Sequence, residues 1–178
     1  MNQNFNGITP SMTKISMSVD TAVRLSKHPN IIGLKDSSAN TVYFQALKYS
    51  INKDNFVLFV GSEEIMAETV LMGGNGGATG GANLFPKLYV KMYNAALADD
   101  FETIKVLQKQ ILEIATLIYT VGKYNSSFLK GLKGSASLLG ICNNYLVSPL
   151  KPFLEKEMIQ ISNNLERIQS HLKDLSLN

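Results

Sequence analysis

Two fully apolar runs separated by a helical segment limit what this chain can fold into more than any other feature. They are Ile31–Leu34 and "NFVLFVGS" at 55–62, and both are too apolar to alternate between a buried and an exposed face. A glycine-dense stretch at 75–86 is a third strand candidate. Helical segments at 38–51 and 63–74 separate the three. Strands and helices that alternate every ~20–25 residues predict a parallel β-α-β sheet.

The segment before the first apolar run has two parts. Residues 1–17 are polar, and we expect them to be irregular, with Pro10 as a breaker. The next stretch, "SMSVDTAVRLSKH", predicts a short helix with Ser18 as its N-cap, ending before Pro29.

After Pro86 the sequence predicts helices only, at 87–100, 101–121, 126–140 and 154–175, with no linker before them. The last helix has apolar residues at alternating steps of four and three: Leu154, Met158, Ile161, Leu165, Ile168, Leu172 and Leu175. Such a stripe fits a coiled-coil seam or a face docked on its own domain, and we favour docking.

Composition excludes several classes of protein. With 45% apolar and 17% charged residues, the chain is typical of globular proteins. Its lysines and arginines are scattered, which argues against nucleic acid as a partner. Cys142 is the single cysteine, and we expect it to be buried in a reducing compartment. The start has no signal-peptide pattern and no apolar run reaches membrane-spanning length, so we expect a cytoplasmic protein without a membrane partner.

Lys35 follows the first apolar run, in "GLKDSS". In parallel α/β folds, active sites gather at the carboxyl ends of strands, where Lys35 and Asp36 are expected. A lysine shielded from water there can form a Schiff base with a carbonyl compound. The alternative is a strand-end lysine that reaches into solvent.

Two further motifs have ordinary structural interpretations as well. The loop "GGNGGATGGANLFP" (73–86) fits neither common phosphate-binding pattern, so a tight turn or close approach to a ligand is favoured over nucleotide binding. In "GSEE" (61–64), Ser62 can contact substrate or cap a helix. His28 and His171 are expected at the surface, and no residues have metal-ligand spacing.

Taken together, the strand-end motifs "GLKDSS", "FVGSEE" and "GGNGGATGGANLFP" resemble the pyruvate-dependent class I aldolase family of dihydrodipicolinate synthase and N-acetylneuraminate lyase. The segment "TKISMSVDTAVRLSKHPNIIGLKDSS" and the later "SSFLKGLKGSASLLGI" and "SPLKPF" are also similar to that family. The resemblance runs from about residue 8 to the end of the chain.

The resemblance implies the C-terminal part of a (β/α)8 TIM barrel, with about three parallel strands in 1–86. Residues 87–178 would be the final barrel helix and a helical extension, without an independent second domain. It implies a lyase with Lys35 as the Schiff-base nucleophile, held by Asp36 and Ser37, and pyruvate or a related 2-keto acid as substrate, with neither metal nor diffusible cofactor. The other expected site residues are strand-end contacts and pocket lining: Gly61, Ser62, Glu63, Gly76, Gly77 and Ala78.

The sequence also departs from the family. The family has a Tyr-Asn-x-Pro motif whose tyrosine relays protons, and alignment on Pro10 puts Gly7 at the tyrosine position. The threonine pair that binds the keto-acid carboxylate lies on an earlier strand, which this chain does not contain. We therefore expect a truncated form with little activity alone or, alternatively, a non-catalytic fragment or interaction subunit. Because half a barrel leaves its interior and two sheet edges open, we also expect a homo-oligomer.

Overall fold

The structure is a computed structural model that describes residues 4–177. The chain divides into two compact units. The first consists of Met1–Thr79 and Met92–Ile104, and the second of Gly80–Lys91 and Lys105–Asn178. The boundary expected after residue 86 stays a prediction.

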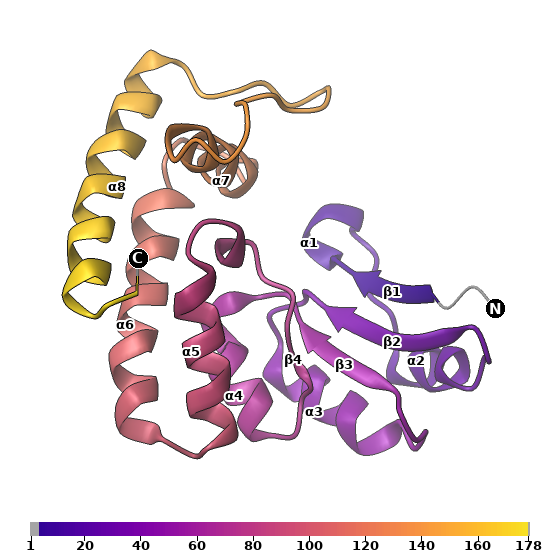
Figure 1. Cartoon of the computed structure of the whole chain (residues 1–178). Coiled ribbons are helices and arrows are strands. Elements are labelled where there is room, and N and C mark those ends of the chain that lie inside the picture. The colour runs from indigo at the N-terminus through magenta and orange to yellow at the C-terminus, as the bar shows by residue number, and fades with distance from the viewer. Residues whose placement is uncertain (1–3, 178) are drawn as a thin grey trace. The chain divides into compact units, whose positions relative to one another are not determined.

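The first unit contains the sheet and its connecting helices. Its strands are β1 (Asn4–Ile8), β2 (Ile31–Asp36), β3 (Val57–Val60) and β4 (Gly76–Gly77). Its helical segments are α1 (Pro10–Thr13), α2 (Val19–Ser26), α3 (Thr41–Ser50), η1 (Glu63–Ile65) and α4 (Met66–Leu71). The strands are all parallel and lie in the order β1-β2-β3-β4, as Figure 1 shows. The predicted parallel β-α-β sheet is confirmed.

The expectation of about three strands, with an irregular segment at 1–17, was wrong. The missed strand is β1, "NFNGI", which has little strand propensity of its own. Its pairing with β2 defines it as a strand, and pairing between distant segments cannot be read from local propensity. Pro10 does not break a helix but begins the short α1, because the first position of a helix needs no backbone N–H.

The N-termini of α2 and α3 are each capped by a side chain. Ser18 Oγ accepts a hydrogen bond from the backbone N–H of Thr21, which confirms the predicted cap of α2. Asn40 Oδ1 does the same for Tyr43 at the start of α3. Helix α3 lies beside both α2 and α4.

Burial distinguishes the two faces of the sheet. Ile8, Asp36 and Val60 are register neighbours on β1, β2 and β3, and each is at most 6% exposed. Phe44 and Leu47 of α3 are also fully buried. Because side chains alternate along a strand, the neighbouring row points to the opposite face. That second row is Gly7, Lys35, Phe59 and Gly76, one residue from each strand.

The second unit is helical. It contains η2 (Gly81–Asn83), α7 (Ser127–Leu138) and α8 (Glu155–Asp174). It also contains parts of α5 (Pro86–Leu97) and α6 (Phe101–Ile118), the rest of which belong to the first unit. All four predicted helices after Pro86 are present, with slightly shorter bounds.

Helix α8 docks on its own unit, as favoured from its apolar stripe. Four of the seven stripe residues are buried: Ile161, Leu165, Ile168 and Leu172. On the flank of the stripe, Asn164 Nδ2 donates a hydrogen bond to the carbonyl of Leu117 on α6, at 2.6 Å. Leu154 is the clearest exception, since it is 76% exposed just before the helix begins.

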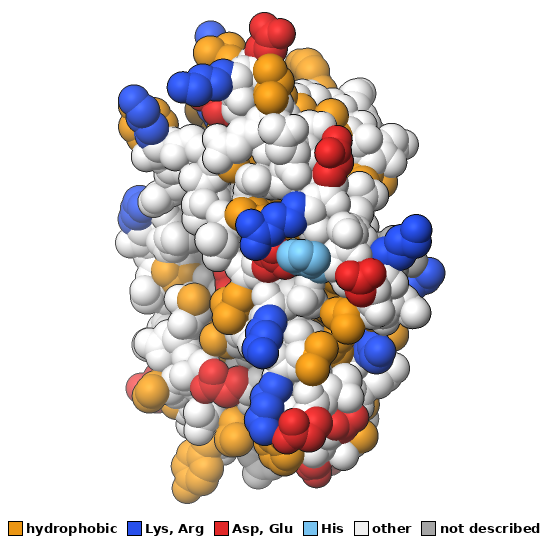
Figure 2. All heavy atoms as spheres, turned by 90° about the vertical axis from the view of Figure 1, so that its left-hand side faces the viewer, with side chains coloured by type: hydrophobic (Ala, Val, Ile, Leu, Met, Phe, Trp, Pro, Cys, Tyr) orange, Lys and Arg blue, Asp and Glu red, His pale blue; other side chains and the backbone are white. Residues whose placement is uncertain are grey.

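A small charged cluster joins α6 and α8 at the surface. Glu113 lies 2.8 Å from Arg167 Nε through one carboxylate oxygen and 2.8 Å from His171 Nδ1 through the other. Figure 2 shows this face, where acidic, basic and histidine side chains are mixed. His171 is therefore at the surface, as expected, but it contacts a carboxylate.

Cys142 was expected to be buried, and this was wrong. It is exposed in the segment that follows α7. The apolar neighbours that suggested burial do not form a core there, since Ile141 is also exposed.

Two glycines of α7 give a matched test of the packing in the second unit. A Cβ on Gly131 would clash with the backbone carbonyl of Ile118, whereas a Cβ on Gly134 would lie 3.0 Å from the Sδ atom of Met158. The backbone of Ile118 cannot move aside for an added methyl group, but the flexible side chain of Met158 can. We expect Gly131→Ala to lower the free energy of unfolding by about 1–3 kcal/mol. Gly134→Ala should change it by less than about 1 kcal/mol, because alanine favours the helix.

Denaturant titration followed by circular dichroism measures both variants. Equal losses of stability in the two would contradict the assigned packing of α7 on the end of α6.

Candidate active site

At the carboxyl ends of the four strands, backbone hydrogen bonds between neighbouring strands continue for one residue past the strand ends. The N–H of Ser37 donates to Ile8 O at 2.9 Å, and the N–H of Gly61 donates to Asp36 O at 2.6 Å. The N–H of Ala78 donates to Val60 O at 2.8 Å. The residues that follow β2, β3 and β4 therefore form one row at the carboxyl edge of the sheet.

Lys35 is the next-to-last residue of β2 and lies on the face opposite the buried row of Asp36. Its side chain is half-buried. It runs close to Gly61, since a Cβ built on Gly61 would lie 2.9 Å from Lys35 Cε. The same Cβ would lie 2.8 Å from Ser37 Cβ and closer still to its hydroxyl. Glycine at 61 is therefore the residue that lets Lys35 and Ser37 share this space.

Asp36 does not hold Lys35, in contrast to what the resemblance implied. Its carboxylate points to the other face and accepts two hydrogen bonds from Ser38, from the backbone N–H at 2.8 Å and from the hydroxyl at 3.0 Å. Burial raises the pKa of Asp36 above its ordinary value, and the two bonds from Ser38 partly oppose this. The residue thus closes the turn after β2 and fixes the position of Ser37.

Tyr43, in the first turn of α3, shares the surroundings of Asp36. Burial raises its pKa, and the nearby Asp36 charge raises it further. Its hydroxyl has no hydrogen-bond partner within the described residues.

The predicted contacts after β3 occupy the same edge. Ser62 is half-buried at the N-cap position of η1, but its side chain makes no capping hydrogen bond, so the capping interpretation was wrong. Glu63 follows as the first residue of η1 and is only 2% exposed. A carboxyl group this deeply buried beside a strand end is unusual for a surface turn.

The glycine-rich loop at 73–86 contains β4, the last strand of the sheet. Gly76 and Gly77 form β4, so the third strand predicted within 75–86 is only two residues long. Gly76 has φ +137°, and a Cβ there would meet Tyr93 at 3.4 Å and Phe59 at 3.6 Å. Ala78 is exposed. The rings of Phe59 and Tyr93, which sequence reasoning missed, therefore flank the loop.

Gly7 is the direct neighbour of Lys35 on β1. A Cβ built on Gly7 would meet no atom within 4 Å. Gly7 thus lies on the same face of the sheet as Lys35, with open space beside it.

The structure gives no sign of a metal centre in residues 4–177, where no three His, Cys, Asp or Glu side chains gather. Within the same residues, no helix combines the length and hydropathy needed to cross a membrane.

Comparison with known proteins finds one family. The model of the dihydrodipicolinate synthetase family matches residues 8–168. A 4-hydroxy-tetrahydrodipicolinate synthase of Methanosarcina mazei is 31% identical over 159 residues, which cover 89% of this chain and 53% of the relative. The chain therefore spans about half the length of the curated relatives it matches.

Solved structures give the same result. A dihydrodipicolinate synthase from Bacteroides thetaiotaomicron matches with a TM-score of 0.85 and 46% identity, over 92% of this chain and 55% of that one. YagE, a prophage protein of the family from E. coli K12 solved in complex with pyruvate, matches in fold with a TM-score of 0.81 and 20% identity. That match covers 93% of this chain and 55% of YagE.

The contact between Gly61, Ser37 and Lys35 gives a test by double substitution. We expect Gly61→Ala to lower the free energy of unfolding by about 1–3 kcal/mol, because the new methyl group overlaps Ser37. Adding Ser37→Gly removes both Ser37 atoms that overlap the new methyl group and should recover most of the loss, because the remaining close atom is Lys35 Cε near the end of a flexible side chain. Thermal unfolding of the two single variants and the double variant measures this coupling. Additive losses would show that the two residues are not in contact.

Proposed function

Because the chain belongs to the dihydrodipicolinate synthetase family, we propose that it carries the Schiff-base centre of a lyase that acts on pyruvate or a related 2-keto acid. The predicted family is confirmed, and so is the α/β fold with a parallel sheet. The observation that carries the proposal is the position of Lys35. It lies at the carboxyl edge of the sheet, on the less buried face, beside a glycine that leaves room for it.

In the proposed reaction, the unprotonated Lys35 amine attacks the keto carbon of the substrate and forms a carbinolamine. Loss of water then gives an imine between Nζ and that carbon. The imine withdraws electrons, so a proton leaves the adjacent carbon and an enamine forms, which adds to an aldehyde. Cleavage is the reverse. The pyruvate bound to YagE supports the substrate class.

The remaining site residues are proposed to contact the substrate. Gly61, Ser62 and Glu63 follow β3 and would meet its polar groups. Gly76, Gly77 and Ala78 would line the pocket, since glycines let the backbone approach a ligand closely. None of these steps calls for a metal or a diffusible cofactor.

We further propose that the chain corresponds to the C-terminal portion of the family's barrel. Residues 1–86 would be barrel strands and helices, and 87–178 the last barrel helix and the extension. The register pair of Gly7 and Lys35 supports this, since it puts the family's tyrosine position next to the nucleophile. The open edges of the described sheet, at β1 and β4, support a homo-oligomer.

A non-catalytic role is the second candidate, as a fragment or interaction subunit. Gly7 favours it, because a glycine supplies no proton relay beside Lys35.

Trapping of the imine tests the assignment of Lys35. Incubation with pyruvate and borohydride should leave a stable adduct on Lys35, because reduction of the imine makes the bond permanent. Mass spectrometry of the digested protein identifies the modified lysine.

Lys35→Met should abolish this adduct, whereas Lys27→Met, which removes an exposed lysine from the end of α2, should not. An adduct on a different lysine would refute the assignment. The absence of any adduct would favour the non-catalytic role.

Steady-state turnover by the 178-residue chain alone should be weak or absent. A positioned acid–base group contributes about 10²–10⁴-fold, and Gly7 provides none. The missing threonine pair would also leave the substrate carboxylate without orientation, which is a separate loss. Gly7→Tyr should therefore restore little, whereas co-expression with the first half of a family member should restore much more.

Synthase and lyase assays with the purified chain measure this. Robust activity that disappears in Lys35→Met would contradict the prediction and leave the Schiff-base assignment intact.

A further inference from the structure

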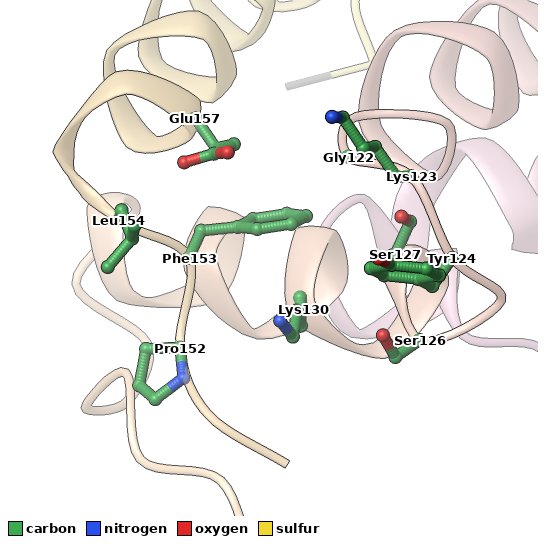
Figure 3. A pocket seen from close by; sticks show the side chains of 10 residues that line it. All are labelled: Gly122, Lys123, Tyr124, Ser126, Ser127, Lys130, Pro152, Phe153, Leu154 and Glu157. Carbon is green, nitrogen blue, oxygen red and sulfur yellow. The ribbon is translucent and has the colours of Figure 1, made fainter.

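A cavity of about 190 Å³ lies within the second unit, and none of its lining residues is among those proposed for Schiff-base chemistry. It is bounded by the loop that precedes α7, the first turn of α7, and the chain that enters α8. Its walls are Gly122, Lys123, Tyr124, Ser126, Ser127, Lys130, Pro152, Phe153, Leu154 and Glu157. Figure 3 shows how these side chains surround the opening.

One wall is the N-terminus of the twelve-residue helix α7. Ser127, its first residue, is only 6% exposed and lines the cavity. Its backbone N–H donates to Tyr124 O at 2.8 Å, but its hydroxyl has no hydrogen-bond partner among residues 4–177. The hydroxyl oxygen is not itself enclosed, so it can reach a ligand in the cavity, and it lies where backbone N–H groups favour an anion.

Gly122 keeps the cavity open at this point. Its φ is +100°, and a Cβ there would lie 2.8 Å from Ser127 Oγ and 3.0 Å from the ring of Phe153. Any other residue at 122 would therefore press on both the hydroxyl and the ring.

The cavity carries charges of both signs that do not neutralise one another. Within the described chain, Glu157 forms no ion pair with Lys123 or Lys130. Glu157 Oε2 is enclosed and lacks a hydrogen-bond donor. In Figure 3, Glu157 and Lys123 face each other above the Phe153 ring, and Lys130 lies below it. Lys130 Nζ is 5.5 Å from the centre of that ring.

We propose that this cavity binds a small carboxylate that also carries a hydrogen-bond donor on the neighbouring carbon, as in a 2-hydroxy or 2-amino acid. The ligand's carboxylate meets Ser127, the start of α7 and the lysines, and its hydroxyl or ammonium group donates to Glu157. The volume suits a compact metabolite, since drug-sized ligands occupy cavities of about 300–1,000 Å³. The proposal does not depend on Lys35.

The test uses three acids with the same three-carbon skeleton: propionate, lactate and alanine. Each is titrated into the ¹⁵N-labelled 178-residue chain, and amide shifts are followed by NMR. Lactate, alanine or both should give saturable shifts confined to residues 122–130 and 153–157. Propionate should bind about tenfold more weakly or worse, because it offers Glu157 no donor.

Two pairs of variants assign the effect to named groups. Glu157→Gln should remove most of the preference over propionate, and Lys130→Met should weaken binding of all three acids. Glu155→Gln and Lys133→Met alter the same two helices outside the cavity, and both should bind as the unaltered chain does.

Titration of the three acids into the unaltered chain tests the proposal even if a variant fails to fold. The proposal is overturned if no acid saturates these residues by about 20 mM, or if propionate binds as well as lactate and alanine. A preference that survives Glu157→Gln in a folded variant would also overturn it.

Discussion

The parallel ladder that continues past the strand ends is the constraint on which the candidate site depends. Hydrogen bonds from Gly61 to Asp36, and from Ala78 to Val60, bring segments from distant parts of the sequence to one edge. A strand rises about 3.3 Å per residue, so a slip of one register position would move Lys35 away from Gly61 and turn it to the other face. Every proposed role at this edge therefore rests on backbone pairing.

Asp36 couples this ladder to the turn that leads from β2 into α3. Its carboxylate is fully buried and binds Ser38, while its carbonyl accepts the bond from Gly61. Burial raises its pKa, so the carboxylate is less easily ionised than an exposed one. Adjacent residues on β2 thus have different tasks: Asp36 fixes the turn, and Lys35 remains available on the opposite face.

Glycine has different structural roles in the two units. At Gly61, glycine makes room for a lysine and a serine that a catalytic site can use. At Gly131, it allows a helix to lie directly on a backbone carbonyl, which serves packing alone. At Gly122, the missing side chain leaves open the cavity beside the buried residue Ser127. The same residue type in the printed sequence gives no hint of which task it serves.

The sequence by itself determined the alternation of strands and helices, the helical second half and the position of Lys35 at a strand end. These follow from periodicity and from motifs that are local in the chain. Only the tertiary structure decided that β1 is a strand and that Cys142 is exposed. It also brought Phe59 and Tyr93 to Gly76. Each of these depends on contacts between residues far apart in sequence, which no local pattern encodes.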